Sequence, residues 1–234
     1  MCYYLSGDYM NFLKKHSKLI KGIFSLILFF SSVYIQEFLV LLFGIKKITY
    51  KIAVILNASS SIIILVILFL LYSSDLKKEW KTFKDKWDKN LDIGIKYWLI
   101  GLLGMMVSNI ILTFIFNNNG AENEQAVQKM ISALPIVMVI SAGLIAPIVE
   151  EITFRKVFRD NIKNDLAFVL ISGIFFGFLH VYQSEGIGQF LYIIPYSCLG
   201  ISFATMYKKT NTVFTSTMMH MFHNTVLTIL SILV

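Results

Sequence analysis

The sequence predicts an all-α, polytopic bundle of transmembrane helices. Of the 234 residues, 56% are hydrophobic and 15% are charged, and the mean hydropathy is +0.70, which is outside the usual balance of a soluble globular domain. The apolar residues form blocks of about 20, the length that a helix needs to cross a hydrocarbon core. Short basic stretches separate the blocks. Several helices are therefore expected to span the bilayer.

Seven apolar blocks are candidate spans. They comprise residues 22–45, 52–72, 93–116, 134–154, 166–183, 190–206 and 212–233. With the N-terminus in the cytoplasm, 17 of the 21 lysines and arginines lie on the inner side, as the positive-inside rule favours. Lys46, Lys47, Lys51 and Lys129 are the exceptions. We therefore predict a multi-pass protein of the cell membrane, surrounded by the lipid bilayer, with a cytoplasmic N-terminus.

The N-terminal segment precedes a long apolar run. Its lysines resemble the start of a signal peptide, but the run has no small-x-small cleavage pattern, so it is interpreted as an uncleaved first span. Met10 begins a more ordinary membrane-protein N-terminus. Residues 1–9 are therefore interpreted as an upstream extension without a structural role.

Two connecting segments are distinctive. Asp75–Asn90 places Trp80, Phe83 and Trp87 at helical spacing among lysines, which suits a helix lying on an anionic membrane surface. A solvated linker helix is an equal alternative. The polar segment Asn117–Gln125 is predicted to be a loop.

Charge placement and cysteine count argue against nucleic-acid binding and against structural cysteine sites. The formal net charge is +7, but the lysines lie between apolar blocks, where orientation in the membrane explains them without nucleic acid. Only Cys2 and Cys198 are present, so neither a disulfide framework nor a cysteine-based zinc site is predicted.

Ionisable residues inside a membrane are costly and tend to face a bundle interior or a wet cavity. Three clusters of this kind stand out. They are Glu150 to Arg155 at the end of the fourth span, Phe176 to His180 in the fifth, and His220 to Asn224 in the seventh. Each cluster alone also has a structural explanation, as interfacial anchors or as a hydrogen-bonded core histidine.

Helical geometry separates the two glutamates of the first cluster. Glu151 and Arg155 stand four residues apart on one face and can pair, whereas Glu150 points about 100° away. Glu150 is thereby available for a site. Pro147 frees the carbonyl of Gly143, four residues earlier, so a bend beside the acid is one expectation and simple tolerance of a proline is the other.

The other two clusters supply histidines. His180 ends an apolar run in which Gly173 and Gly177 form a small-xxx-small face for close helix approach. His220 and Asn224 are one turn apart and share a face, so one partner atom can meet both. His223 points elsewhere, toward a supporting position or the lipid headgroups.

One glutamate, two histidines and an asparagine from three helices form a set suited to activating water and stabilising an oxyanion. We therefore predict Glu150, His180, His220 and Asn224 as the catalytic residues. A serine mechanism is weaker, because no serine lies in a nucleophile-elbow sequence, and a cysteine mechanism would depend on Cys198 alone.

These motifs resemble those of the CAAX protease and bacteriocin-processing (CPBP, or Abi) family, which includes the type II CAAX prenyl endopeptidases. The family patterns EExxxR, FxxxH and HxxxN match Glu150-Glu151 with Arg155, Phe176 with His180, and His220 with Asn224, in the family's order. The resemblance extends from about residue 134 to the C-terminus. Each motif is weak alone, but the ordered set in membrane helices is strong.

The resemblance implies a helical bundle with a membrane-embedded catalytic cavity that cleaves a peptide or protein substrate near the membrane. Glu150, assisted by His180, would activate water, and His220 with Asn224 would stabilise the oxyanion. Glu151, Arg155 and Phe176 would be supporting residues.

We predict a division of the chain into three parts, of which only the last rests on the resemblance. Residues 1–21 form a cytoplasmic segment, residues 22–133 contain three helices with a basic amphipathic linker, and residues 134–234 form the CPBP-like catalytic core.

A metal cofactor is not required by this prediction. Glu150, His180 and His220 could make a three-ligand zinc site with an open position, but there is no HExxH pair, and Asn224 suits oxyanion binding better than metal ligation. One geometric difficulty concerns the histidines. His180 lies about 22 Å along its helix from Asp165, whereas His220 lies only about 12 Å beyond Thr212, so upright helices would not bring them together.

Two other classes of protein stay open at the level of sequence. One is a non-catalytic membrane scaffold or bacteriocin self-immunity protein with the same fold. The other is a small transporter, which would use buried polar residues as an ion path. Gln36 and Glu37 would favour the transporter if they lined a route through the protein, although a helix end or an interhelical hydrogen bond also explains them.

Overall fold

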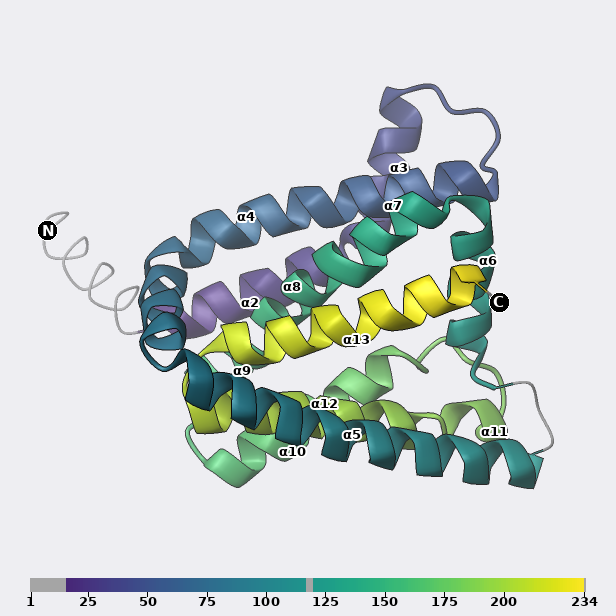
Figure 1. Ribbon diagram of the computed structural model, residues 1–234. Helices are drawn as coiled ribbons and strands as arrows, with labels where there is room; N and C mark the ends of the chain where they lie inside the picture. The colour runs from purple at the N-terminus through teal and green to yellow at the C-terminus, as the bar shows by residue number, and fades with distance from the viewer. Residues whose placement is uncertain (1–15, 117–119, 234) are drawn as a thin grey trace, which may run out of the picture.

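The computed structural model describes residues 16–116 and 120–233, and every regular element in this part of the chain is a helix. Most helices run side by side along one axis, and shorter segments cross the two ends of the bundle (Figure 1). The predicted all-α fold class is confirmed. The extension proposed for residues 1–9, together with Cys2, lies outside the described residues.

The first predicted span is a bent pair of helices. Helices α2 (Ser17–Phe30) and α3 (Ser32–Leu42) meet at an angle of 52°. At the break, the Ser31 hydroxyl donates to the Leu28 carbonyl at 2.8 Å, a local bond that often accompanies a bend. Helix α3 buries none of its residues and projects past the next helix at one edge of the bundle (Figure 1).

The next two helices are longer than the predicted spans. Helix α4 (Tyr50–Asp85) begins at an N-cap where Thr49 accepts from the Ile52 amide, and helix α5 (Trp87–Phe116) follows after Lys86. The end of α4 crosses one end of the bundle (Figure 1). The basic linker is therefore the end of α4 and the start of α5 rather than a separate helix.

The aromatic residues of this linker have an inner and an outer side. Phe83 is buried, whereas Trp80 and Trp87 are 43% and 45% exposed. Phe83 contacts both tryptophan rings and also Phe214. The segment is therefore amphipathic, as predicted from its spacing.

The predicted loop over Asn117–Gln125 is wrong from Glu122 onward, because helix α6 spans Glu122–Ala133 and crosses the other end of the bundle (Figure 1). Glu122 and Glu124 occupy its first turn, where carboxylates interact favourably with the positive end of a helix dipole. Polarity therefore marked a helix start rather than a loop. Residues 117–119 lie outside the described residues.

The fourth span is a continuous helical run with two π-helical turns. Its parts are α7 (Pro135–Ile140), η1 (Ser141–Ile145), α8 (Ala146–Glu151), η2 (Ile152–Lys156) and α9 (Val157–Asn161). A proline has no N–H for the carbonyl four residues earlier, and a wide π turn is one way to accommodate it. The disturbance expected at Pro147 takes this form, because η1 ends two residues before it. The second π turn carries Arg155.

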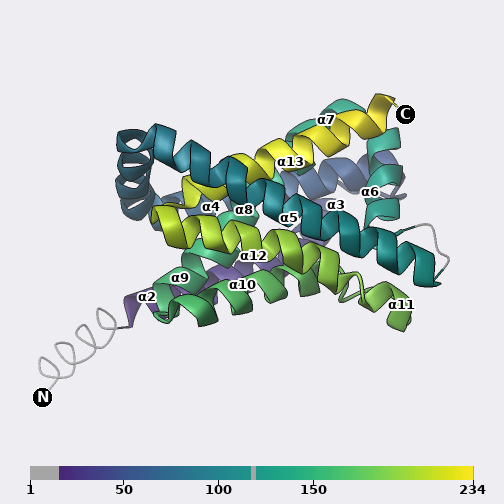
Figure 2. The same ribbon diagram turned by 60° about the horizontal axis from the view of Figure 1, so that its bottom comes forward.

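The C-terminal part contains the remaining helices. They are α10 (Asp165–Leu179), α11 (Ile187–Phe190), α12 (Ile193–Thr210) and α13 (Val213–Leu233). Helix α12 lies between α5 and α10 (Figure 2). A Cβ atom on Gly173 would lie 2.6 Å from the Ile201 nitrogen, and one on Gly177 would lie 2.7 Å from the Ile193 oxygen. The small-xxx-small face therefore packs closely against α12.

Fewer helices have the length and apolar character of a full span than the seven predicted blocks. In the described residues, four helical segments are long and apolar enough to cross a membrane, or five if the bent pair α2–α3 counts as one span. All seven predicted blocks are helical. Helix α10 has only 15 residues, about 22 Å, and α13 contains His220, His223 and Asn224, which lower its apolar character.

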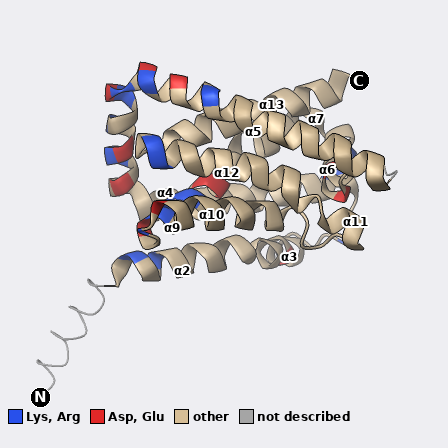
Figure 3. Ribbon diagram, turned by 90° about the horizontal axis from the view of Figure 1, so that it is seen from below, with Lys and Arg blue, Asp and Glu red and all other residues tan. Residues whose placement is uncertain are grey.

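Charged residues gather at one end of the bundle (Figure 3). The start of α2, the α4–α5 junction, α9 and the end of α12 meet there. Segments that the positive-inside rule assigned to one side of the membrane therefore share one end of the molecule. That this end faces the cytoplasm stays a prediction.

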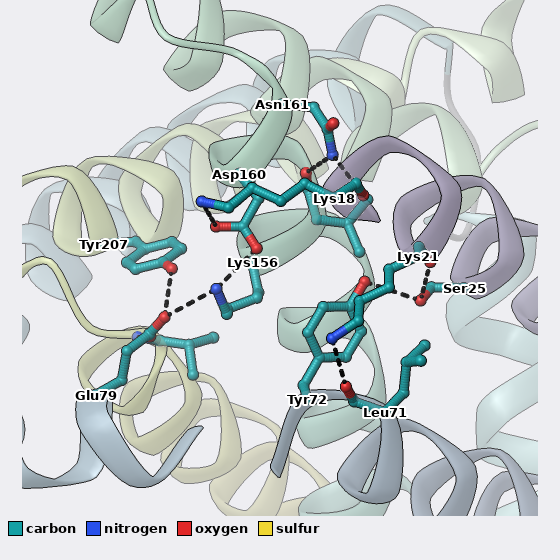
Figure 4. Close-up of polar contacts among 12 residues, drawn as sticks. Lys18, Lys21, Ser25, Leu71, Tyr72, Glu79, Lys156, Asp160, Asn161 and Tyr207 are labelled. Atoms are coloured by element: carbon teal, nitrogen blue, oxygen red, sulfur yellow. Dashed lines mark hydrogen bonds and ion pairs between the residues drawn. The ribbon is translucent and has the colours of Figure 1, made fainter. Parts of the chain in front are cut away.

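A buried ion network ties the helices together at this end (Figure 4). The Lys156 ammonium lies 3.2 Å from Glu79 and 2.8 Å from Asp160, and its side chain is only 5% exposed. Glu79 also accepts from the Tyr207 hydroxyl at 2.8 Å and from the Val213 amide at 2.7 Å. Helices α4, α9, α12 and α13 are thereby held in a fixed arrangement close to the π turn η2.

Candidate functional site

The glutamate and arginine of the first motif form a fully buried pair. Arg155 Nε lies 3.4 Å from Glu151 Oε2, and neither side chain is exposed. The pairing expected from the four-residue spacing is therefore present. Removing two charges from water is costly, so each hydrogen bond to the remaining groups of the pair stabilises it.

Helix α10 supplies hydrogen-bond partners for one guanidinium nitrogen, whereas Arg155 Nε and Nη2 and Glu151 Oε2 have no hydrogen-bond partner among the described residues. Arg155 donates to both the carbonyl and the hydroxyl of Ser172, at 3.1 and 2.9 Å, and Ser172 in turn donates to the Phe154 carbonyl at 2.6 Å. The guanidinium also lies over the Phe176 ring, 4.8 Å from its centroid. Arginine suits this position better than lysine, because its planar fork serves a carboxylate, a carbonyl and an aromatic face together.

His220 lies between the two consecutive glutamates. Its Nδ1 atom is 3.1 Å from Glu151 Oε1, and its Nε2 atom is 3.8 Å from Glu150 Oε2. His220 and Glu151 are buried, whereas the Glu150 side chain is 21% exposed. The arrangement joins a buried, charge-paired acid to an accessible one through a single imidazole.

Aromatic rings fix the orientation of this imidazole. Phe203 stacks on His220 with a centroid distance of 4.7 Å and an angle of 22°, and Phe176 meets it edge-on at 5.5 Å. Phe203 is fully buried and Phe176 nearly so. A ring held on two sides keeps its nitrogens aimed at the glutamates, which is the kind of positioning that acid–base chemistry needs.

His180 reaches the site from the end of α10. Its Nδ1 atom lies 2.8 Å from the Phe176 carbonyl, so Nδ1 donates and the neutral ring has its lone pair on Nε2. Tyr196 stacks on the ring at 4.4 Å, and Phe176 contacts it at 4.6 Å. The Phe176 ring therefore contacts both His180 and His220, so the two histidines pack against one side chain despite their different depths in upright helices.

Asn224 is placed by the π turn η1. Its side-chain amide donates to the Ala142 carbonyl at 3.1 Å, and Thr225 donates to the Gly143 carbonyl at 3.3 Å. The Gly143 carbonyl is the one that Pro147 leaves without an N–H, so α13 satisfies the backbone groups that the fourth span releases. An amide nitrogen has two N–H groups, which leaves one of them for another acceptor.

The other polar residues considered from the sequence have different settings. His223 is buried and accepts from the Trp98 indole at 3.4 Å, so it does not face the headgroups. Glu37 is exposed on α3, which buries no residue, and hence Gln36 and Glu37 do not line a route through the described part of the chain.

The candidate zinc ligands do not form a metal centre. Among the described residues, no group of three or more histidine, cysteine, aspartate or glutamate side chains is arranged to hold an ion. Nδ1 of His220 faces Glu151 and Nδ1 of His180 faces a carbonyl, contacts that leave Nε2 of each ring free. As placed, however, Glu150, His180 and His220 do not form a group that could hold one ion. That no metal is required stays a prediction.

Sequence reasoning missed several residues that build the site. Ser172, Tyr196 and Phe203 position the arginine and the two histidines, but their residue types are common in apolar spans and gave no signal. Asn57 had a detectable signal, since it is an isolated amide in an apolar block. It lines a cavity next to Glu150.

The fold and this cluster define a multi-pass helical membrane protein with a buried glutamate–arginine–histidine centre. Residues 132–226 match the family model described as type II CAAX prenyl endopeptidase Rce1-like. The four candidate catalytic residues lie inside the matched stretch. The resemblance to the CPBP family that the three motifs indicated is therefore confirmed.

Two curated proteins are similar to about half of this chain. The chain is 28% identical over 137 residues to "Putative membrane peptidase YdiL" of Bacillus subtilis (strain 168), which covers 57% of this chain and 53% of that protein. It is 25% identical over 138 residues to "UPF0177 protein YxdF" of Lactococcus lactis subsp. lactis (strain IL1403), covering 56% and 75%. The match therefore spans about half the length of the Bacillus protein. No solved structure matches the chain significantly.

Proposed function

We propose that this chain is a membrane endopeptidase that hydrolyses a peptide bond of a peptide precursor or membrane-proximal protein segment with a water activated by Glu150. The observation that carries the proposal is the placement of His220 between the charge-paired Glu151 and the partly exposed Glu150. The Rce1-like match and the peptidase name of the Bacillus relative support the same reaction class.

In the proposed reaction, Glu150 takes a proton from water as the water oxygen attacks the peptide carbonyl carbon. The carbonyl electron pair moves to oxygen, and the resulting oxyanion accepts hydrogen bonds from Asn224 and from His220 when its Nε2 is protonated. The tetrahedral intermediate then collapses, the C–N bond breaks, and the leaving amine takes the proton from Glu150. His180, with its lone pair on Nε2, assists the proton transfer.

Glu151 and Arg155 have a positioning role in this scheme. A carboxylate only accepts hydrogen bonds, so the contact with Glu151 requires the proton of His220 on Nδ1. Nε2 then carries the lone pair of the neutral ring and faces Glu150, and it donates to the oxyanion only when both ring nitrogens carry protons. Arg155 keeps Glu151 in place.

The proposal is tested by measuring cleavage of a quenched fluorescent peptide library by the purified protein in detergent. Glu150→Gln and His220→Ala should each lower the rate by about 10²- to 10⁴-fold, the usual contribution of an acid–base group. Glu37→Gln, which changes an exposed glutamate on α3, is the matched control and should cleave at the wild-type rate.

A chelator separates the remaining mechanisms. Cleavage that is lost in both variants but persists with chelator supports the glutamate-activated water. Cleavage that chelator abolishes and zinc restores would overturn the metal-free mechanism. Equal rates for the wild type and both variants would instead favour the non-catalytic scaffold.

A further inference from the structure

A polar cavity of about 170 Å³ lies next to Glu150, on the side of α8 that faces α4. Besides Glu150, its polar lining comes from Ser32 at the start of α3 and from Asn57, Ser60 and Ser61 of α4. These helices lie outside the stretch that matches the Rce1-like family. The cavity therefore joins the candidate catalytic glutamate to a part of the chain that the family match does not describe.

The hydrogen-bonding capacity of this lining is largely unused. The side chains of Asn57, Ser61 and Ser32 make no hydrogen bond to any residue that the structure describes, whereas Ser60 donates to the Asn57 carbonyl at 2.9 Å. Asn57 is exposed in the structure and lies in a membrane-spanning helix, where a polar group without a partner is costly. An exposed amide at this position can take its partner from water or from a ligand in the cavity.

The chemistry of the lining indicates what that partner is. Hydroxyl and amide groups both donate and accept, and none of the residues that line the cavity is basic, so the cavity does not suit a phosphate or another anion. The groups suit a neutral ligand that also donates and accepts. A peptide in extended conformation is such a ligand, because each of its backbone units carries one N–H and one C=O that need partners inside a membrane.

We propose that this cavity binds the extended substrate backbone beside the cleaved bond, with the Asn57 amide pairing to one peptide unit and Ser61 to another. This inference rests on the proposed endopeptidase function and names its substrate class as an extended peptide segment. Asn57 is a substrate-binding residue in this scheme. The break between α2 and α3 contributes by placing Ser32 at the cavity.

Two serines on the same helix provide a matched test. Ser61 lines the cavity and Ser59 does not. In the quenched-peptide assay, Asn57→Leu and Ser61→Ala should raise KM about 10-fold and about threefold, with smaller changes in kcat. Ser59→Ala should leave both constants unchanged. Asn57→Gln, which keeps an amide, should raise KM less than Asn57→Leu does.

Binding is measured separately in the Glu150→Gln background, with a fluorescein-labelled peptide drawn from the same library. Weaker binding after Asn57→Leu in this background, with binding unchanged after Ser59→Ala, supports the cavity assignment.

If the wild type cleaves but Asn57→Leu changes neither KM nor binding, the cavity assignment is overturned and the endopeptidase function stands. If no peptide is cleaved but binding depends on Asn57, the endopeptidase function fails and the peptide site stands. If no library peptide binds the Glu150→Gln protein, the cavity assignment is overturned.

Discussion

Substitution of Arg155 by methionine should destabilise the protein far more than the same substitution at Arg159, the other arginine of the chain. Arg155 is fully buried, lies 3.4 Å from Glu151, and donates two hydrogen bonds to Ser172. Methionine has a similar length but no charge and no donor. The substitution therefore leaves a buried carboxylate without its counter-ion.

The expected magnitude follows from burial. Removing one partner of a buried ion pair costs about 3–5 kcal/mol, because the other charge stays buried and unpaired. Arg159 makes a shorter contact, 2.7 Å to Asp165, but these side chains are 26% and 50% exposed, and such pairs contribute about 0–1 kcal/mol. In a chain of this size about 1 kcal/mol shifts Tm by roughly 2–4 °C. Arg155→Met should therefore lower Tm by about 6–20 °C and Arg159→Met by at most about 4 °C.

The measurement is thermal unfolding of the detergent-purified proteins, followed by the fluorescence of the three tryptophans. The double variant Glu151→Gln with Arg155→Met should lose less stability than the sum of the single variants, because each single change already breaks the same pair. An Arg155→Met protein that unfolds within about 2 °C of Arg159→Met would refute the assignment of Arg155 to the buried centre, since about 2 °C corresponds to 1 kcal/mol or less.

Three further outcomes are expected from the contacts. Gly177→Ala should destabilise by about 1–3 kcal/mol in the same thermal assay, because the added methyl group meets the Ser197 side chain on α12. Lys156→Met should lower Tm, since it removes the ammonium from its pair with Glu79, and the difference in Tm from the wild type should persist at about 0.5 M salt, which screens exposed pairs far more than buried ones. Asn224→Ala should lower kcat by about 10²- to 10³-fold with little change in KM if its free N–H binds the oxyanion, and an unchanged kcat would remove that role.

The membrane character and the paired residues of the first motif were predictable because they depend on local rules. Block length predicts helices, and a four-residue spacing predicts the contact between Glu151 and Arg155, which is present at 3.4 Å. The carbonyl released by Pro147 was also predictable from covalent geometry. Its partner, Thr225 of α13, was not, because that contact depends on how two distant helices pack.

The position of His220 could not be predicted because it depends on tertiary packing. Sequence spacing separated Glu150 from Glu151 by about 100°, yet both contact His220, because the imidazole has two nitrogens and lies between them. The start of α6 was read as a loop from its polarity. The 52° bend in the first span was also missed, although the Ser31–Ser32 pair at the break is a local signal for a kink.

The different surroundings of the two adjacent glutamates predict different effects of substitution, one on stability and the other on cleavage. Glu151 is fully buried and paired with Arg155, so Glu151→Gln leaves the guanidinium unpaired and should lower Tm strongly. Glu150 is 21% exposed and lines the cavity, and among the described residues its one ionic contact is His220 at 3.8 Å. Glu150→Gln should therefore keep Tm within about 2 °C of the wild type. The same substitution should remove cleavage. Thermal unfolding and peptide cleavage, measured for both variants, distinguish the structural glutamate from the catalytic one. If Glu151→Gln kept stability while Glu150→Gln lost it, Glu150 would be the structural acid, and the tautomer of His220 would have to be set from the other side.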